Sequence, residues 1–165
     1  MLGRAVDYLQ SGKYHEALLL FKKVKTRYDL SNRYVAFMGV CAYYDNDYAL
    51  AASLLLPVLP SLSPYAPQEQ AVYLYCAAQS LMKTHGYDTA IGLFEQYTTI
   101  CKPAERTEAL AAEAECYMQT GEWEKAEECI ESARLYCMKY EKGGASSEKM
   151  QKIDRLAATC SEKRP

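Results

Sequence analysis

One short phrase recurs four times along this chain at nearly constant spacing. In each copy an aromatic residue is followed three positions later by Ala and four positions after that by a large apolar side chain. The alanines are Ala17, Ala51, Ala90 and Ala126, which lie 34, 39 and 36 residues apart. A period of this size is typical of folds made of stacked helical repeats. The repeat therefore constrains the fold of the 165-residue chain more than any other feature.

The apolar residues follow the 3.6-residue period of an α-helix almost throughout. Gly12, Asn46, Gly86 and Gly121 interrupt this pattern, and we expect each to take the left-handed conformation that closes a helix. Because the interruptions span only two to four residues, we expect consecutive helices to be antiparallel. The predicted helices lie near residues 2–10, 14–28, 32–45, 48–58, 68–84, 87–101, 104–119, 123–140 and 147–162.

Small residues recur in phase within these helices. The repeated Ala lies in the first turn of the second helix of each pair, while Ala5, Gly39, Ala78 and Ala114 occupy corresponding positions in the first helices. A small side chain on each facing surface lets two helix backbones approach closely. The pattern therefore predicts tightly packed helix pairs.

Two segments carry a family resemblance. Residues 38–51 (MGVCAYYDNDYALA) and 114–126 (AECYMQTGEWEKA) resemble the tetratricopeptide repeat, a unit of about 34 residues. The resemblance implies an all-α fold, a right-handed α-solenoid of antiparallel helix pairs in a single domain spanning 1–165. Its four repeats would cover approximately 1–30, 31–66, 67–103 and 104–142, with a C-terminal capping helix at 146–162.

The proline-rich end of the second repeat and the C-terminal helix depart from the regular repeat pattern. Four prolines between Pro57 and Pro67 predict that a helix ends or kinks around Pro57, followed by an extended elbow. Near the C-terminus, Ser146 or Ser147 can cap a last helix. That helix has an apolar face suited to cover the end of a repeat array, formed by Met150, Ile153, Leu156, Ala157 and Cys160.

The seven cysteines do not indicate a metal site or a disulfide framework. Their number is odd, no Cys-x-x-Cys pair occurs, and most lie among Ala and Leu at helical spacing. We interpret them as small apolar core residues in a reducing compartment, which favours a cytoplasmic location. No stretch is long and apolar enough for a membrane span.

Catalysis and nucleic-acid binding are also disfavoured. The only histidines, His15 and His85, lie at a helix start and in a turn, and no phosphate-binding loop or catalytic motif accompanies them. The net charge of −2 comes from +2 in residues 1–60, −6 in 61–142 and +2 in 143–165. Because no basic stripe results, we expect no nucleic-acid partner, no cofactor and no enzymatic activity.

In the tetratricopeptide-repeat family, the first helix of each pair lines a concave groove that binds a segment of a partner protein. Some members clamp acidic chaperone C-termini with Lys and Asn, but this chain has Val40, Gln79 and Glu115 among those positions, which predicts no clamp. The resemblance places the following residues in the groove: Arg33, Phe37, Val40, Tyr43, Tyr44, Tyr75, Gln79, Met82, Lys83, Glu115, Met118 and Gln119.

Two functions remain open at the level of sequence. The first is a non-catalytic scaffold or adaptor that binds a partner peptide or helix in the groove, through an aromatic and methionine-lined surface suited to an apolar anchor. The alternative is a structural module that mediates self-assembly or docks within a larger polypeptide or complex. Concentration-dependent self-association would favour the alternative.

Overall fold

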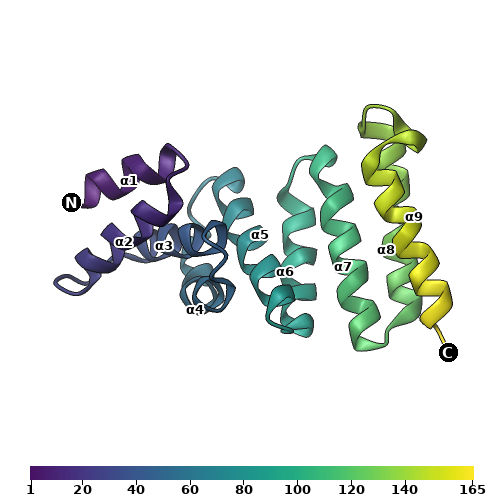
Figure 1. Cartoon of the computed structure of the whole chain (residues 1–165), viewed down its shortest axis with the longest axis horizontal. Coiled ribbons are helices and arrows are strands. Elements are labelled where there is room, and N and C mark those ends of the chain that lie inside the picture. The colour runs from purple at the N-terminus through teal and green to yellow at the C-terminus, as the bar shows by residue number, and fades with distance from the viewer. The chain divides into compact units, whose positions relative to one another are not determined.

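A computed structural model describes residues 1–165, and every regular element in it is a helix (Figure 1). Short 3-10 turns at Leu59–Leu62, Pro103–Glu105 and Gly144–Ser146 join some of the longer helices. Most helix ends agree with the sequence-based prediction, although the second helix ends at Lys25 instead of continuing to residue 28. The helices are α1 (Leu2–Gln10), α2 (Tyr14–Lys25), α3 (Asn32–Tyr44), α4 (Tyr48–Val58), α5 (Pro67–Lys83), α6 (Tyr87–Ile100), α7 (Arg106–Thr120), α8 (Trp123–Tyr140) and α9 (Glu148–Lys163).

The helices form two compact units, an N-terminal unit from Met1 to His85 and a C-terminal unit from Gly86 to Pro165. The division falls between α5 and α6, inside the third predicted repeat. In the N-terminal unit α1 packs on α2, α3 packs on α4, and α5 contacts both α3 and α4. In the C-terminal unit α7 packs between α6 and α8, and α9 covers α8 and part of α7. Each unit therefore has its own core.

The four turns that precede the repeated aromatics share one backbone geometry. The residue two positions before the aromatic is left-handed in every copy, with φ of 76° at Gly12, 63° at Asn46, 65° at His85 and 80° at Gly121. The prediction was therefore wrong at Gly86, which has a φ of −85°. His85 takes the left-handed conformation instead, because the turn is set by its distance from the following aromatic.

The close helix approach predicted from the small residues is present. Ala5, Ala17, Ala51, Ala90 and Ala126 are all fully buried. A methyl group added at Gly39 would come within 2.5 Å of Leu55 Cγ. Leu55 is the large apolar residue that follows the repeated Ala51 by four positions in α4. Backbone contact between α3 and α4 therefore depends on the absence of a side chain at this position.

The proline-rich segment ends α4 and starts α5. Helix α4 continues one residue past Pro57 to Val58 and passes into the 3-10 turn, in which Leu62 is buried. Pro67 is the first residue of α5, where its missing N–H would have no helical partner. The predicted helix end near Pro57 is therefore confirmed, whereas the predicted extended elbow was wrong because residues 59–62 form a 3-10 turn.

Helix α9 completes the C-terminal unit. The hydroxyl of Ser147 accepts a hydrogen bond of 3.2 Å from the backbone N–H of Met150, so Ser147 is the N-cap. Met150, Ile153 and Cys160 are buried against the preceding helices, while the other two residues of the predicted face are half-buried. Six of the seven cysteines are buried in the same way, as expected for small core residues, and Cys129 is half-buried.

Candidate partner-binding surface

Five tyrosine side chains meet around the C-terminal end of α3 in the N-terminal unit. The rings of Tyr14 and Tyr44 are stacked, with centroids 4.4 Å apart and an interplanar angle of 18°. Tyr43 contacts Tyr44, Tyr48 and Tyr75 edge to face, with centroid distances of 5.0, 5.8 and 6.4 Å. Such pairs contribute about 0.5–1.5 kcal/mol each beyond their buried area. The cluster therefore joins helices α2, α3, α4 and α5 through aromatic contacts.

The repeat itself explains the position of these rings. Tyr14 and Tyr48 are the repeated aromatics at the start of α2 and α4. Both lie next to the C-terminal end of α3. Tyr44 keeps 48% of its surface exposed although one face of its ring is covered by Tyr14. Partial burial raises the pKa of both Tyr43 and Tyr44, so both hydroxyls stay protonated at neutral pH.

A second polar and aromatic contact joins the beginning of α3 to the beginning of α5. Arg33 Nε donates a hydrogen bond of 3.1 Å to Glu69 Oε2, and the Tyr73 hydroxyl donates one of 2.9 Å to the same oxygen. The guanidinium also lies over the rings of Tyr65 and Phe37, at 4.7 and 5.6 Å from their centroids. The hydrogen bond to Glu69 is the largest cause of the raised pKa of Arg33. These contacts also fix the side chain along α3.

The residues predicted for the groove differ widely in accessibility. In the N-terminal unit Arg33, Tyr44 and Lys83 are exposed, whereas the others on α3 and α5 are half-buried or buried. The structure brings Tyr43, Tyr44 and Tyr75 together, and it places Arg33 against Phe37. In the C-terminal unit all three predicted residues lie on α7, where Glu115 and Gln119 are exposed and Met118 is half-buried.

Val40 is the predicted residue with the least surface to offer, because it is only 5% exposed. Helix α3 is packed against α1, α2, α4 and α5, so few of its positions face solvent. The prediction of groove residues on α3 required one broad face of this helix to be free. The helix has neighbours on too many sides for such a face to remain.

The sequence-based set also omitted other side chains that reach the surface of the N-terminal unit, among them Val72 and the half-buried Tyr8. Val72 is 44% exposed and lies one turn before Tyr75 on α5, so extending the helical register by one turn would have found it. Tyr8 on α1 lies under two cations, with Arg4 Cζ at 6.0 Å and Lys13 Nζ at 5.6 Å from its ring centroid. No sequence signal indicates that these two cations meet at one ring.

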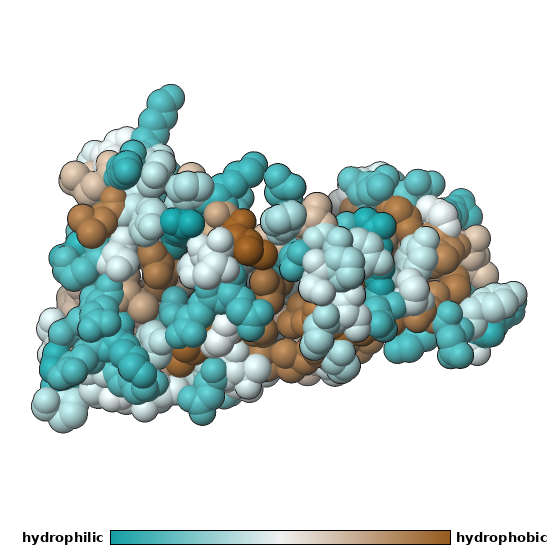
Figure 2. Space-filling model, turned by 180° about the vertical axis from the view of Figure 1, so that it is seen from behind, coloured by the Kyte–Doolittle hydropathy of each residue, from teal (hydrophilic) through white to brown (hydrophobic).

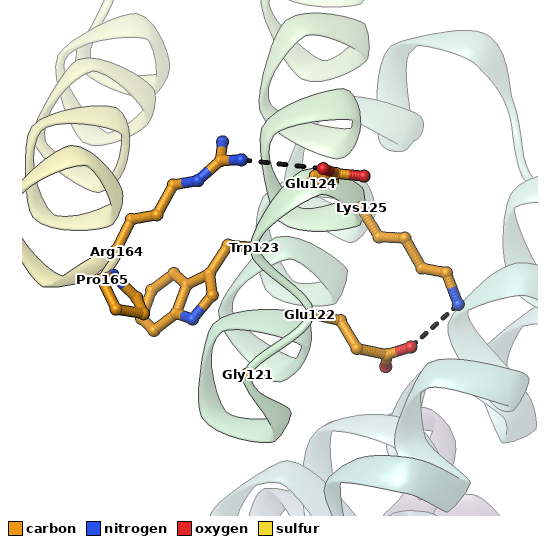
Figure 3. Close-up of a pocket in the computed structure, with 7 residues that line it drawn as sticks. All are labelled: Gly121, Glu122, Trp123, Glu124, Lys125, Arg164 and Pro165. Atoms are coloured by element: carbon orange, nitrogen blue, oxygen red, sulfur yellow. Dashed lines mark hydrogen bonds and ion pairs between the residues drawn. The ribbon is translucent and has the colours of Figure 1, made fainter.

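The C-terminal unit presents a different kind of surface. A pocket of about 370 Å³ is lined by the turn and first residues of α8, 121–125, together with Arg164 and Pro165 (Figure 3). Trp123 forms one wall beside Pro165, and Arg164 reaches from the end of α9 to the acidic start of α8. The guanidinium of Arg164 lies 2.7 Å from Glu127 Oε2 and 3.8 Å from Glu124 Oε1. The pocket is open to solvent, and it combines the Trp123 ring with charged side chains of α8 and the chain end.

The charge of the two units is opposite. The N-terminal unit has eight Lys and Arg against six Asp and Glu, and the C-terminal unit has eleven against fifteen. Apolar residues still reach the surface in both units, as the brown patches among teal residues in Figure 2 illustrate. The N-terminal unit therefore combines a weakly positive charge with exposed aromatic rings, and the C-terminal unit is acidic.

No helix of the structure combines the length and the apolar character needed to cross a membrane. No family model matches the sequence, and none of the curated proteins matches it either.

Solved structures of MamA resemble the chain over almost its whole length. The structure described as MamA 41-end from Desulfovibrio magneticus RS-1 is 18% identical and has a TM-score of 0.63, covering 97% of this chain and 90% of that one. MamA MSR-1 C2 is 14% identical with a TM-score of 0.64, covering 95% and 94%. The MamA RS-1 ArsTM double mutant is 18% identical with a TM-score of 0.62, covering 97% and 94%. These likenesses show that the all-α fold is a TPR-like helical repeat fold.

Proposed function

We propose that the chain is a tetratricopeptide-repeat protein that acts as a non-catalytic scaffold and binds a segment of a partner protein. The contact region is the α3–α5 surface, which we define as Phe37, Tyr44, Val72, Tyr75 and Gln79. The likeness to MamA supports this proposal through the fold, since repeats of antiparallel helices present extended surfaces to partners.

The observation that carries the proposal is the exposed but pre-stacked ring of Tyr44. Exposed aromatic side chains are frequent anchors of protein interfaces because they bury a large area on binding. Tyr44 is already stacked against Tyr14, so this side chain would lose little conformational entropy when a partner binds. Val72 adds an exposed aliphatic side chain on the adjacent helix. Apolar side chains of the partner would lie against each of these two residues.

The proposal is tested with the Tyr44→Ala/Tyr75→Ala double variant. We expect this variant to bind the partner at least about 30-fold more weakly, because aromatic anchors of interfaces contribute about 2 kcal/mol or more. Partners are captured with the wild-type protein from its native source and identified by mass spectrometry, and capture is then repeated with the variant. The matched control is Leu135→Ala, which removes a highly exposed apolar side chain of α8 in the C-terminal unit.

Circular dichroism must accompany this comparison, because the two tyrosines belong to the cluster at the end of α3 and their loss could destabilise the unit. A variant that stays folded and retains its partner at full affinity would place the binding surface elsewhere. Loss of binding in the Leu135→Ala control alone would place it on α8.

Self-assembly is the second candidate function, and the opposite charges of the two units favour it. A weakly positive unit of one copy and the acidic unit of another would attract each other in solution. Light scattering at low and high salt distinguishes the two functions. Self-association that disappears at high salt would support assembly through charge, and a monomer at all concentrations would support the adaptor.

A further inference from the structure

Glu113 is the only acidic side chain in the chain that is buried. It lies in the middle of α7, between α6 and α8, and only 5% of its surface is exposed. A buried carboxylate without a cation loses its hydration without compensation. The position of Glu113 in the core of the C-terminal unit therefore needs a physical explanation.

The nearest polar neighbours of Glu113 provide no positive charge. Its carboxyl shares a hydrogen bond with the hydroxyl of Tyr117, one turn further along α7. The same hydroxyl donates a hydrogen bond of 2.9 Å to Glu95 Oε1 on α6. Cys129 on α8 also lies within electrostatic reach of the carboxyl. Two carboxyl groups from different helices therefore meet at one hydroxyl group.

The number of hydrogen-bond donors among Glu95, Glu113 and Tyr117 favours one protonation state of Glu113. A tyrosine hydroxyl has one proton to donate, and an ionised carboxylate can only accept. In the structure Tyr117 directs its one proton at Glu95, which is exposed to water, so an ionised Glu113 would have to compete with Glu95 for this donor. If Glu113 is neutral, its own O–H donates to the Tyr117 oxygen while Tyr117 donates to Glu95. The neutral form of Glu113 therefore satisfies all three groups.

We propose that the C-terminal unit is proton-sensitive: Glu113 is neutral when α6, α7 and α8 are fully packed, and its ionisation loosens that packing. The switch lies outside the α3–α5 surface and does not depend on the proposed partner. It makes the stability of one unit respond to pH near neutrality.

The surrounding charges agree with this assignment. Burial and the negative charge of Glu95 together raise the pKa of Glu113 to about 7, against the opposing effect of the hydrogen bond from Tyr117. On α8, Lys125 pairs with Glu122 at 2.8 Å and lies over the Tyr117 ring at 5.6 Å, while Glu128 adds negative charge near Cys129.

Charged groups on the other packed elements are engaged elsewhere. Lys149 of α9 pairs with Glu141 and Glu108, and Arg164 beyond α9 pairs with Glu127 and Glu124. In the 3-10 turn before α7, Glu105 accepts hydrogen bonds from the Tyr97 hydroxyl and the backbone N–H of Lys102.

The direction of the pH effect follows from the two states of Glu113. The folded-state pKa of about 7 lies above the ordinary value of 4.5, so the folded protein binds this proton more tightly than the unfolded chain. The resulting stabilisation is complete below pH 4.5 and is lost as the pH rises through 7. The folding equilibrium constant of the C-terminal unit should decrease by about tenfold to a hundredfold across this window through Glu113 alone.

The test compares urea unfolding of the wild-type chain and Glu113→Gln from pH 5 to pH 8. Trp123 is the only tryptophan of the chain and lies in the C-terminal unit, so its fluorescence reports on that unit. The amide of Gln imitates the neutral carboxyl and donates to Tyr117 at every pH. We expect Glu113→Gln to remove the decrease and to be more stable than wild type at pH 8. Glu128→Gln, which removes an exposed carboxylate of α8, should keep the wild-type pH dependence.

Equal pH dependence in wild type and Glu113→Gln would overturn the proposal. A direct measurement on the wild-type chain keeps the test independent of how well the variant folds. The side-chain carboxyl carbon of Glu113, followed by NMR, should titrate near pH 7, whereas titration near 4.5 would contradict a neutral buried form.

Discussion

The two units have the same repeated phrase but are held together by different chemistry. In the N-terminal unit five tyrosines are in ring contact around the end of α3, Arg33 pairs with Glu69, and His15 forms a hydrogen bond with Asp45. In the C-terminal unit ion pairs join α7, α8, α9 and the chain end, and a carboxyl group is buried in the core. The repeated Ala and its aromatic therefore determine how the two helices of a pair pack. The other positions determine whether aromatic contacts or ion pairs stabilise the unit.

This difference has a consequence for function. Aromatic contacts carry no net charge, so the tyrosine cluster of the N-terminal unit should depend less on salt than an ion pair does. Exposed ion pairs are screened by salt, and a buried carboxyl responds to protons. The unit that we propose to bind a partner is therefore distinct from the unit that responds to its surroundings.

Removing α9 should have the largest effect, and it should act on one unit. Deleting residues 145–165 exposes the apolar face of α8 and removes the buried side chains of Met150, Ile153 and Cys160. We expect the C-terminal unit to lose about 5 kcal/mol, on the basis of about 1.5–3 kcal/mol for each large buried side chain. The loss should appear as aggregation or as earlier unfolding by Trp123 fluorescence. A truncated chain as stable as the parent would show that α9 does not contribute to the core.

The next largest effect is a difference in stability between two Gly→Ala substitutions in the middle of helices. Gly39→Ala in α3 would force the new methyl group into Leu55, and we expect a destabilisation of about 1–3 kcal/mol. Gly92→Ala in α6 meets nothing within 4 Å and should stabilise its helix by about 0.5–1 kcal/mol, because Ala has the higher helix propensity. Chemical denaturation followed by circular dichroism measures both. Changes of the same sign would contradict the close approach of α3 and α4.

The sequence predicted the backbone of both units well and their tertiary contacts poorly. The distances between aromatic, Ala and apolar residue are local, so they correctly predict the helix pairs and the places of the turns, although His85 and not Gly86 is the left-handed residue of the third turn. Arg33 and Glu69 are 36 residues apart, and Glu95 and Tyr117 are 22 apart, so their contacts depend on how helices pack. Glu113 has the sequence context of an ordinary surface glutamate in an acidic helix. Only its position between α6 and α8 reveals that it is buried.

Calorimetric titration of the identified partner tests the functional difference between the two units most directly. The account predicts that Tyr44→Ala/Tyr75→Ala weakens binding at least about 30-fold while a Leu135→Ala/Met138→Ala variant of α8 stays close to wild type. It also predicts little change in wild-type affinity at high salt, because the proposed anchor is apolar. The opposite pattern, with binding lost in the α8 variant or at high salt and retained in the tyrosine variant, would contradict the assignment of partner binding to the N-terminal unit.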